Sequence, residues 1–214
     1  MTHRNLPVQR GLTLVELLIG IAVMALLMVL AAPSFTSMIE MQRLRGTSDQ
    51  LTTDLQFLRS EAVSRQERTG ISFASNASMT CYVVHTCGTI NGIDCLCDCR
   101  GATPAARCGT GQKREIKVVQ LPRSSKVEVK PVTVSGAALT ADHVTIDPAT
   151  GGMEIFYVIG LTPMPTPTVT EFWAEAALAT GASTSGSLQT RINLMGRPTV
   201  CSPGGVVKGP TTCP

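Results

Sequence analysis

Cysteine is the residue type in this sequence with the most evident chemistry. All cysteines lie beyond residue 80, at positions 81, 87, 95, 97, 99, 108, 201 and 213 (Cys81, Cys87, Cys95, Cys97, Cys99, Cys108, Cys201 and Cys213). An even number of cysteines downstream of a long apolar segment indicates an oxidising compartment and disulfides. We expect Cys201 to pair with Cys213, whereas the rest of the connectivity cannot be read from the sequence.

A metal cluster is the alternative for the run CLCDC, residues 95–99, which has His85 nearby. Paired cysteines of structural zinc sites usually have two to four residues between them, whereas these alternate with single residues. We therefore expect disulfides, no metal and no cofactor. His85 and His143 lie far from any hydrolase signature such as Gly-x-Ser-x-Gly, so the sequence predicts no enzyme.

Basic residues gather between residues 113 and 130. The stretch contains six basic residues and two acidic ones: Lys113, Arg114, Lys117, Arg123, Lys126 and Lys130, and Glu115 and Glu128. Such a stretch binds phosphates without sequence preference, so DNA is one partner to consider. A solvated charged face is the other interpretation, and the whole chain carries a formal charge of only +3.

A lone carboxylate, Glu16, lies at the head of an apolar run from Leu12 to Ala32. The run reaches the ~20 residues that a membrane-spanning helix needs. Arg4 and Arg10 precede it, and the positive-inside rule then places the N-terminus in the cytoplasm and the rest of the chain outside. A cleavable signal peptide is the alternative, although Glu16 interrupts its apolar core and Pro33 follows Ala32 directly.

The helix is expected to continue to about Arg68, with a kink at Pro33 and Gly70 as its terminator. Apolar residues recur at helical spacing at Leu51, Leu55, Leu58 and Ala62. Charged residues fall between the stripe positions, and we assign them to the polar face: Asp49, Asp54, Arg59, Glu61 and Arg65. The apolar helix thus becomes amphipathic, as it would on leaving a bilayer and packing on a globular body.

The rest of the chain has β patterning and turn signals. Short strands are predicted at 71–73, 81–84, 116–121, 126–134, 144–146, 153–158, 172–178 and 188–194, with a hairpin turn at DPATGG. Three segments are expected to be loops: the cysteine-rich residues 86–111, the extended, polyproline-like TPMPTPT at 162–168, and GASTSGS at 181–187. The fold class is α+β: a long helix packed on an antiparallel, disulfide-stapled sheet domain.

The segment GLTLVELL, residues 11–18, resembles the processing site of type IV pilins and type II secretion pseudopilins. The resemblance implies a leader of residues 1–11, cleavage after Gly11 by a prepilin peptidase, and methylation of the new N-terminus at Leu12. It further implies an assembly role for Glu16, whose carboxylate would accept the charged amine of a neighbouring subunit. A snorkelling carboxylate without a partner is the alternative.

The later segments VTIDPATGG and RINLMGRP resemble the FimT/GspH kind of minor pilins and pseudopilins. In FimT-like pilins a Gly-Arg-x-Arg motif is linked to DNA uptake, and Arg197 matches its first arginine while Thr199 replaces the second. The resemblance divides the chain into the leader, a transmembrane and assembly helix (12–35), an amphipathic helix (36–69) and a β-rich domain (70–214).

The resemblance predicts a minor pilin or pseudopilin, anchored by one helix in the inner membrane with a periplasmic C-terminal domain, which assembles into a type IV pilus-like filament. Its expected partners are other pilin subunits, the prepilin peptidase and the inner-membrane assembly platform. Three alternatives remain: a DNA-binding minor pilin for natural transformation, a pseudopilin of type II secretion, and a membrane-tethered enzyme or metalloprotein.

Overall fold

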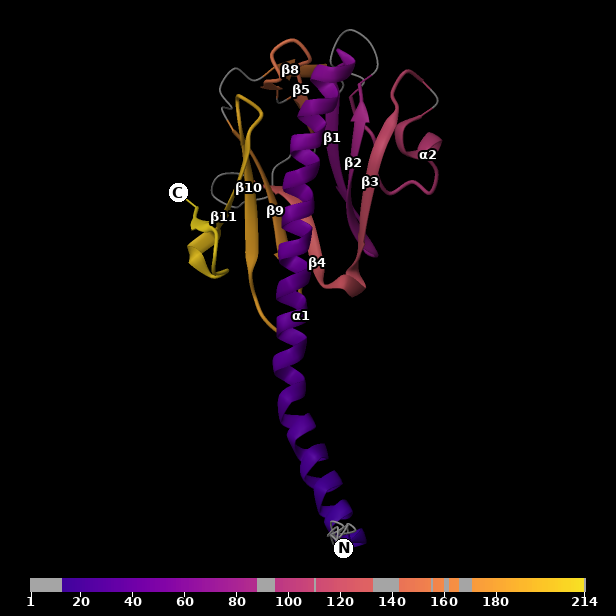
Figure 1. Cartoon of the computed structure of the whole chain (residues 1–214). Helices are drawn as coiled ribbons and strands as arrows, with labels where there is room; N and C mark the ends of the chain where they lie inside the picture. The colour runs from indigo at the N-terminus through magenta and orange to yellow at the C-terminus, as the bar shows by residue number, and fades with distance from the viewer. Residues whose placement is uncertain are drawn as a thin grey trace, which may run out of the picture.

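The computed structural model describes residues 13–87, 95–109, 111–132, 143–154, 156–159, 162–165 and 171–213. A single long helix, α1 (Leu14–Arg65), runs along the faces of two sheets and projects well beyond them at its N-terminal end (Figure 1). Thr13 precedes the helix in an extended conformation, and its hydroxyl accepts the backbone N–H of Glu16 at 3.2 Å. This is an N-cap, which satisfies one of the unpaired donors of the first turn.

The predicted bend is present. The parts Leu14–Val29 and Ser34–Arg65 are inclined by 43° to one another, and Pro33 lies between them. Within the described residues, no unbroken helix has the length and apolar composition of a membrane span, whereas these two bent parts taken together do.

The helix ends earlier than predicted. Gln66, not Gly70, adopts the left-handed conformation that terminates it, with φ of 53°. The side-chain amide of Gln66 donates to the carbonyl of Val63 at 2.7 Å and supports this turn. Gly70 instead lies in strand β1 (Thr69–Ser75), where the hydroxyl of Thr69 donates to the carbonyl of Leu58 at 3.1 Å and ties the strand to the helix.

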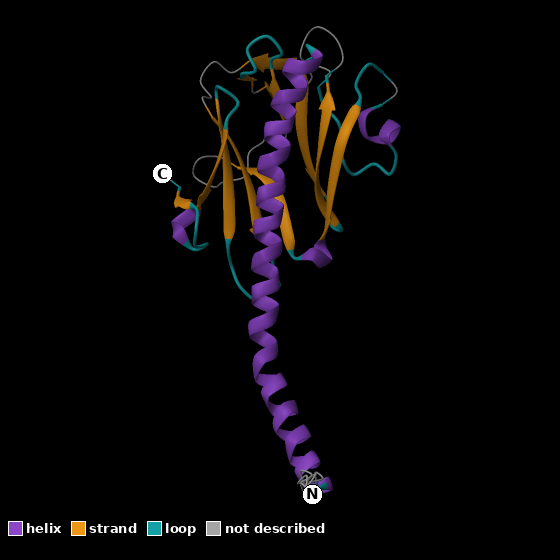
Figure 2. Ribbon diagram, in the orientation of Figure 1, coloured by secondary structure: helices purple, strands orange, loops and turns teal. Residues whose placement is uncertain are grey.

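The strands within the described residues form two five-stranded sheets and a separate two-stranded one, and the two larger sheets flank α1 in Figure 2. The first sheet has the order β3 (Glu115–Pro122), β2 (Met79–Thr86), β1, β5 (His143–Ile146) and β6 (Met153–Glu154). The second has the order β12 (Thr211–Thr212), β11 (Pro198–Ser202), β10 (Ser187–Asn193), β9 (Glu171–Leu178) and β4 (Val127–Val132). The pairings are antiparallel except that of β11 with β12. Short helices α2 (Pro104–Cys108), η1 (Arg123–Ser125) and η2 (Pro203–Gly205) lie in the connections.

The predicted hairpin at DPATGG is confirmed, since Thr145 pairs with Glu154 and Ile146 with Met153 on either side of it. The prediction of a polyproline-like loop at TPMPTPT is wrong for its first half. Thr162–Pro165 forms strand β8, paired with β7 (Phe156–Ile159), and residues 166–168 lie outside the described part. Proline at every second position fits an edge strand, because only alternate residues direct their N–H toward the neighbouring strand.

The main core lies between α1 and the two sheets. The helical stripe predicted from the sequence is at most 2% exposed, and Leu44 extends it toward the N-terminus. These side chains meet Phe73 of β1 and Phe172 of β9, whose rings stack with centroids 5.9 Å apart. Because apolar side chains from both sheets cover one stripe of the helix, burial of that stripe holds the two sheets together.

Candidate functional site

The N-terminal part of α1, residues 14–29, projects beyond the described sheets with its apolar side chains exposed (Figure 1). Its large apolar side chains are each more than half exposed, from Val23 at 54% to Leu14 and Val29 at 74%. Leu14, Val15, Leu17, Leu18, Ile19, Ile21, Val23, Met24, Leu26, Leu27, Met28 and Val29 share this property. Contiguous apolar surface on this scale marks a membrane or protein interaction site, and its burial would be favourable by about 25 cal/mol per Å².

Glu16 lies in the first turn of this exposed half and is itself exposed. A carboxylate is favourable in the first turn because it faces the positive end of the helix dipole. The sequence-predicted processing residues Gly11 and Leu12 lie outside the described residues. Glu16 therefore lies near the N-terminal end of the described helix, on its exposed surface.

Two carboxylates farther along α1 are buried against the sheets. Asp54, which the sequence pattern assigned to the polar face, is 2% exposed, and Glu40 is 4% exposed. The hydroxyl of Tyr82 and the ammonium of Lys117 donate to Asp54 at 2.8 and 2.6 Å. Helical periodicity missed Asp54 because its position borders the apolar stripe, and the partners that permit burial come from β2 and β3, which are distant in sequence.

The basic residues of the predicted phosphate-binding stretch have internal partners. Lys117 pairs with Asp54, Arg114 Nη2 lies 3.1 Å from Glu67 Oε2, and Lys113 Nζ donates to the carbonyl of Leu96 at 3.1 Å. Farther along, Arg123 pairs with Glu128, Lys126 with Glu40, and Lys130 with Glu175. Most of the basic side chains in this stretch therefore form ion pairs and hydrogen bonds within the protein.

Arg197 is not part of that basic stretch in space. Lys113, Arg114 and Lys117 are at or near the start of β3, one edge of the first sheet. Arg197 lies in the β10–β11 turn, beside the opposite edge, where the N–H of Met153 in β6 donates to the carbonyl of Leu194 at 3.0 Å.

A groove of about 350 Å³ adjoins Arg197 and is lined by Gln56, Arg59, Gly196, Arg197 and Pro198. Arg197 is exposed. Arg59 is half-buried, and its Nε donates to the carbonyl of Gly151 at 3.2 Å. Two guanidinium groups and an amide that line one groove can bind an anion through charge-assisted hydrogen bonds. The helical pattern assigns Arg59 to the polar face of the helix, and no feature of the sequence indicates that Arg59 and Arg197 line one groove.

The cysteines form four disulfides, as predicted: Cys81–Cys99, Cys87–Cys95, Cys97–Cys108 and Cys201–Cys213. The expected pairing of Cys201 with Cys213 is confirmed. Cys81, Cys97, Cys99 and Cys108 are buried with Val83 in a second core beside the first sheet. The described residues contain no group of three or more His, Cys, Asp or Glu side chains arranged to hold a metal.

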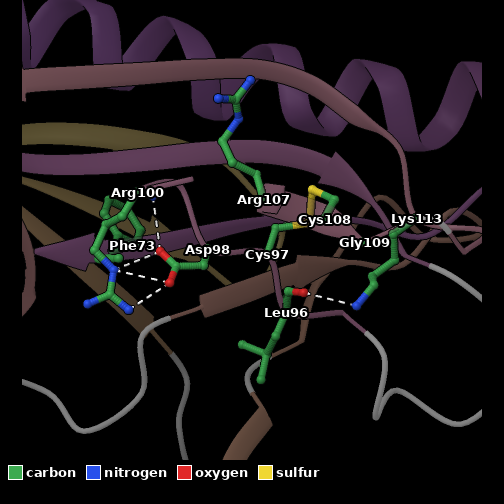
Figure 3. Close-up of a pocket in the computed structure, with 10 residues that line it drawn as sticks. Phe73, Leu96, Cys97, Asp98, Arg100, Arg107, Cys108, Gly109 and Lys113 are labelled. Atoms are coloured by element: carbon green, nitrogen blue, oxygen red, sulfur yellow. Dashed lines mark hydrogen bonds and ion pairs between the residues drawn. A yellow bond between two sulfur atoms is a disulfide. The ribbon is translucent and has the colours of Figure 1, made fainter. Parts of the chain in front are cut away.

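The cysteine-rich loop covers a pocket of about 320 Å³ (Figure 3). Its charged side chains are already engaged: Arg100 binds the carboxylate of Asp98 and Lys113 binds the carbonyl of Leu96. Arg107 pairs with Glu115 and also donates to the carbonyl of Gly101 at 2.8 Å. The pocket is therefore built from groups that hold the loop in place.

A buried histidine, His85, is linked through Ser72 to the cysteine-rich loop. His85 Nδ1 lies 3.3 Å from the carbonyl of Thr86, which can only accept, so the hydrogen is on Nδ1 and Nε2 accepts from the hydroxyl of Ser72 at 2.9 Å. The hydroxyl of Ser72 in turn accepts the N–H of Cys97 at 3.4 Å. Burial lowers the pKa of His85 to about 4, despite the opposing hydrogen bond to Thr86. His85 is neutral at pH 7 and serves as an internal polar support.

An exposed apolar helix that continues into an amphipathic half packed on a disulfide-bonded, largely antiparallel domain is the architecture of a pilin-like subunit. Residues 6–32 match the prokaryotic N-terminal methylation motif, and residues 47–196 match the family described as type II transport protein GspH. The chain belongs to the GspH family of type IV minor pilins and pseudopilins, whose members are structural subunits.

Solved structures of the type IV minor pilin FimU from Pseudomonas aeruginosa (strain PAO1) are similar to this chain. One crystal form, P21, is 18% identical over 81% of this chain and 96% of FimU, with a TM-score of 0.43. A second, P65, is 17% identical over 80% of this chain and all of FimU, with a TM-score of 0.41. A comparison with curated protein sequences found no match.

Proposed function

We propose that this protein is a minor subunit of a type IV pilus-like filament, assembled through the apolar half of α1. The observation that carries the proposal is the exposure of every described large apolar side chain from Leu14 to Val29 on a helix whose other half is packed into a core. Such a surface needs a bilayer before assembly and neighbouring helices afterwards. The anchored state places the protein in the inner membrane, with its disulfide-bonded domain in the oxidising periplasm.

The proposed processing is cleavage after Gly11 by the prepilin peptidase, followed by methylation of the amine of Leu12. The match to the methylation motif supports this step. In the filament, the carboxylate of Glu16 would accept the charged amine of an adjacent subunit. A buried carboxylate is tolerated when paired and strongly unfavourable when alone, so the pair would select one axial position between subunits. The inner-membrane assembly platform is the partner that would extract the subunit from the bilayer.

N-terminal sequencing of the mature protein tests the processing. We expect a chain that begins with methylated Leu12. An intact Met1, or a start at Pro33 as a signal peptidase would produce, contradicts the proposal.

Glu16→Gln tests the pairing. We expect at least a tenfold loss of incorporation into filaments with normal membrane levels, because the amide carries no charge for the neighbour's amine. Asp49→Asn is the matched control, since Asp49 is an exposed acid on the same helix. Equal incorporation of Glu16→Gln and wild type would contradict the pairing.

DNA binding is a second candidate function, favoured by the groove that Arg59 and Arg197 share. Phosphate contacts weaken steeply with salt, so gel shifts at several salt concentrations are the appropriate measurement. Arg197→Ala and Arg59→Ala should each abolish a shift seen at low salt, whereas Lys208→Ala, an exposed cation in the C-terminal loop, should not. No shift of the wild-type protein at low salt would contradict this candidate.

A role as a pseudopilin of type II secretion is favoured by the description of the matching family. It uses the same assembly chemistry with a different platform. Co-purification of the chain with a type II secretion platform or with a pilus platform separates the two, and each result would exclude the other filament as its main destination.

A further inference from the structure

The side chain of Glu40 marks the point where α1 leaves the globular body. On the N-terminal side, Phe35, Met38 and Ile39 are 63%, 60% and 50% exposed, whereas Glu40 is 4% exposed and Leu44 is fully buried. Among the described side chains of the helix, the first deeply buried one is therefore a carboxylate. A carboxylate is unfavourable in such a position unless its oxygens are satisfied.

Two connections of the body supply those partners. Lys126, which follows η1 in the connection from the first sheet to the second, donates from Nζ to Glu40 Oε1 at 2.9 Å. Ser183, in the β9–β10 connection, donates its backbone N–H to Oε2 at 2.7 Å and its hydroxyl to Oε1 at 3.3 Å. The hydrogen bond from Lys126 is the largest influence that lowers the pKa of Glu40. Both oxygens are thus engaged by segments that are distant in sequence.

The backbone of Lys126 provides an independent observation. Its φ is +58°, one of two positive φ values among the described non-glycine residues. A lysine is disfavoured there, by about 1–2 kcal/mol, and a glycine would adopt the same conformation freely. The N–H of Ala179 donates to the carbonyl of Lys126 at 2.9 Å and helps to hold this conformation. Strain of this kind persists only where surrounding contacts hold it, and the contact of the Lys126 side chain with Glu40 is one of them.

We propose that Glu40 and Lys126 form a clamp, together with Ser183, that fixes the direction in which the apolar half of α1 leaves the body. The proposal rests on the proposed function for its purpose, because filament assembly needs each body held in one orientation to its own assembly helix. Glu40 and Lys126 are positioning residues: neither contacts another subunit in this inference, and they act through the orientation of residues 34–39, from which the apolar half continues.

Spin–spin distances on the full-length chain in detergent micelles test the clamp. Labels on cysteines introduced at Ser34 and Thr199 report the orientation of the exit segment to β11, and Ser34 lies on the body side of the residue 30–33 bend. All native cysteines are in disulfides, so the introduced thiols are the ones labelled. The clamp predicts one narrow distance distribution in the wild type and at least a twofold broader one in Lys126→Gly and Glu40→Gln.

Gln66→Gly is the matched control, because Gln66 is the other described non-glycine residue with positive φ and lies at the far end of α1. It should leave the distribution unchanged, and Lys126→Arg should restore the narrow one. A wild-type distribution in Lys126→Gly would overturn the clamp. Because the distances are measured without filaments, absence of the wild-type protein from filaments would contradict the proposed function and leave this result standing.

Discussion

The hydroxyl of Tyr82 in β2 donates to Asp54 of α1 at 2.8 Å, and Lys117 of β3 reaches the other oxygen of the same carboxylate. Tyr82 is fully buried, and burial is the main reason that its pKa is raised, with the charge of Asp54 adding to the effect. The tyrosine therefore remains protonated, and a hydrogen-bond donor, at neutral pH. One buried carboxylate thus connects the helix to two neighbouring strands.

Removing that carboxylate should destabilise the protein. Asp54→Ala leaves the hydroxyl of Tyr82 buried without this acceptor, and we expect a loss of about 2–3 kcal/mol. Tyr82→Phe should lose about 1–2 kcal/mol. Denaturant unfolding followed by the fluorescence of Trp173, the one tryptophan of the chain, measures both. Asp49→Ala, on the exposed face of the same helix, should stay within about 0.5 kcal/mol of wild type.

Stability should fall on mild acidification because of His85. Its folded-state pKa of about 4 lies below the ordinary value of ~6.5, so the unfolded chain binds a proton that the folded protein does not. The penalty is absent above pH 7 and grows as the pH falls toward 4, reaching about 2 kcal/mol at pH 5. Unfolding free energies at pH 7.5 and 5 measure it.

The variant His85→Gln serves as the control for this pH dependence, since an amide does not titrate. It should show a flatter profile between pH 7.5 and 5, whatever its absolute stability. Carboxylates with lowered pKa, namely Glu40, Asp98 and Asp147, contribute stability that is lost only at lower pH, as each is protonated. Equal wild-type stability at pH 7.5 and 5 would refute the role assigned to His85.

Gly196 should not tolerate a side chain. Its φ is +69°, and a Cβ there would lie 2.6 Å from the carbonyl oxygen of Gly151. We expect Gly196→Ala to lose about 2–4 kcal/mol, from backbone strain and from displacement of the β5–β6 turn. Gly181→Ala is the comparison, because Gly181 also has a positive φ but has open space around it. It should lose only about 1 kcal/mol, and equal losses would show that the close approach is unimportant.

The disulfides should differ in their contribution to stability. Cys97–Cys108 and Cys201–Cys213 close loops of similar length, with separations of 11 and 12 residues, so loop closure alone predicts similar values of about 2–3 kcal/mol. Cys97 and Cys108 are both buried in the second core, whereas Cys201 is buried beside Val132 and Trp173 and its partner Cys213 is only partly buried. Replacing that pair by alanines should therefore lose at least about 1 kcal/mol more than replacing Cys201 and Cys213. Denaturant unfolding of the two double variants makes the comparison.

Much of the architecture is predictable from local pattern. The apolar run is recognised from its composition, the bend from Pro33, and the buried face of the helix from the helical spacing of Leu51, Leu55 and Leu58. The hairpin at residues 147–152 and the pairing of Cys201 with Cys213 are equally local. The strand at Thr162–Pro165 was missed because proline alternation is compatible with both a loop and an edge strand, and only the presence of β7 decides between them.

A long helix with an apolar N-terminal half, a carboxylate near the start of that half, and a β-rich body closed by disulfides are all predictable from the sequence, since each depends on composition or short-range spacing. Which charges are buried, and which groups they contact, depends on the tertiary structure. Asp54 contacts Tyr82 and Lys117, Glu40 contacts Lys126 and Ser183, and Arg59 lines the same groove as Arg197. These segments are separated by many residues, and they approach one another only when both sheets pack on one helix. A buried charge is stable only beside such a partner, and spacing along the chain carries no record of which partner that will be.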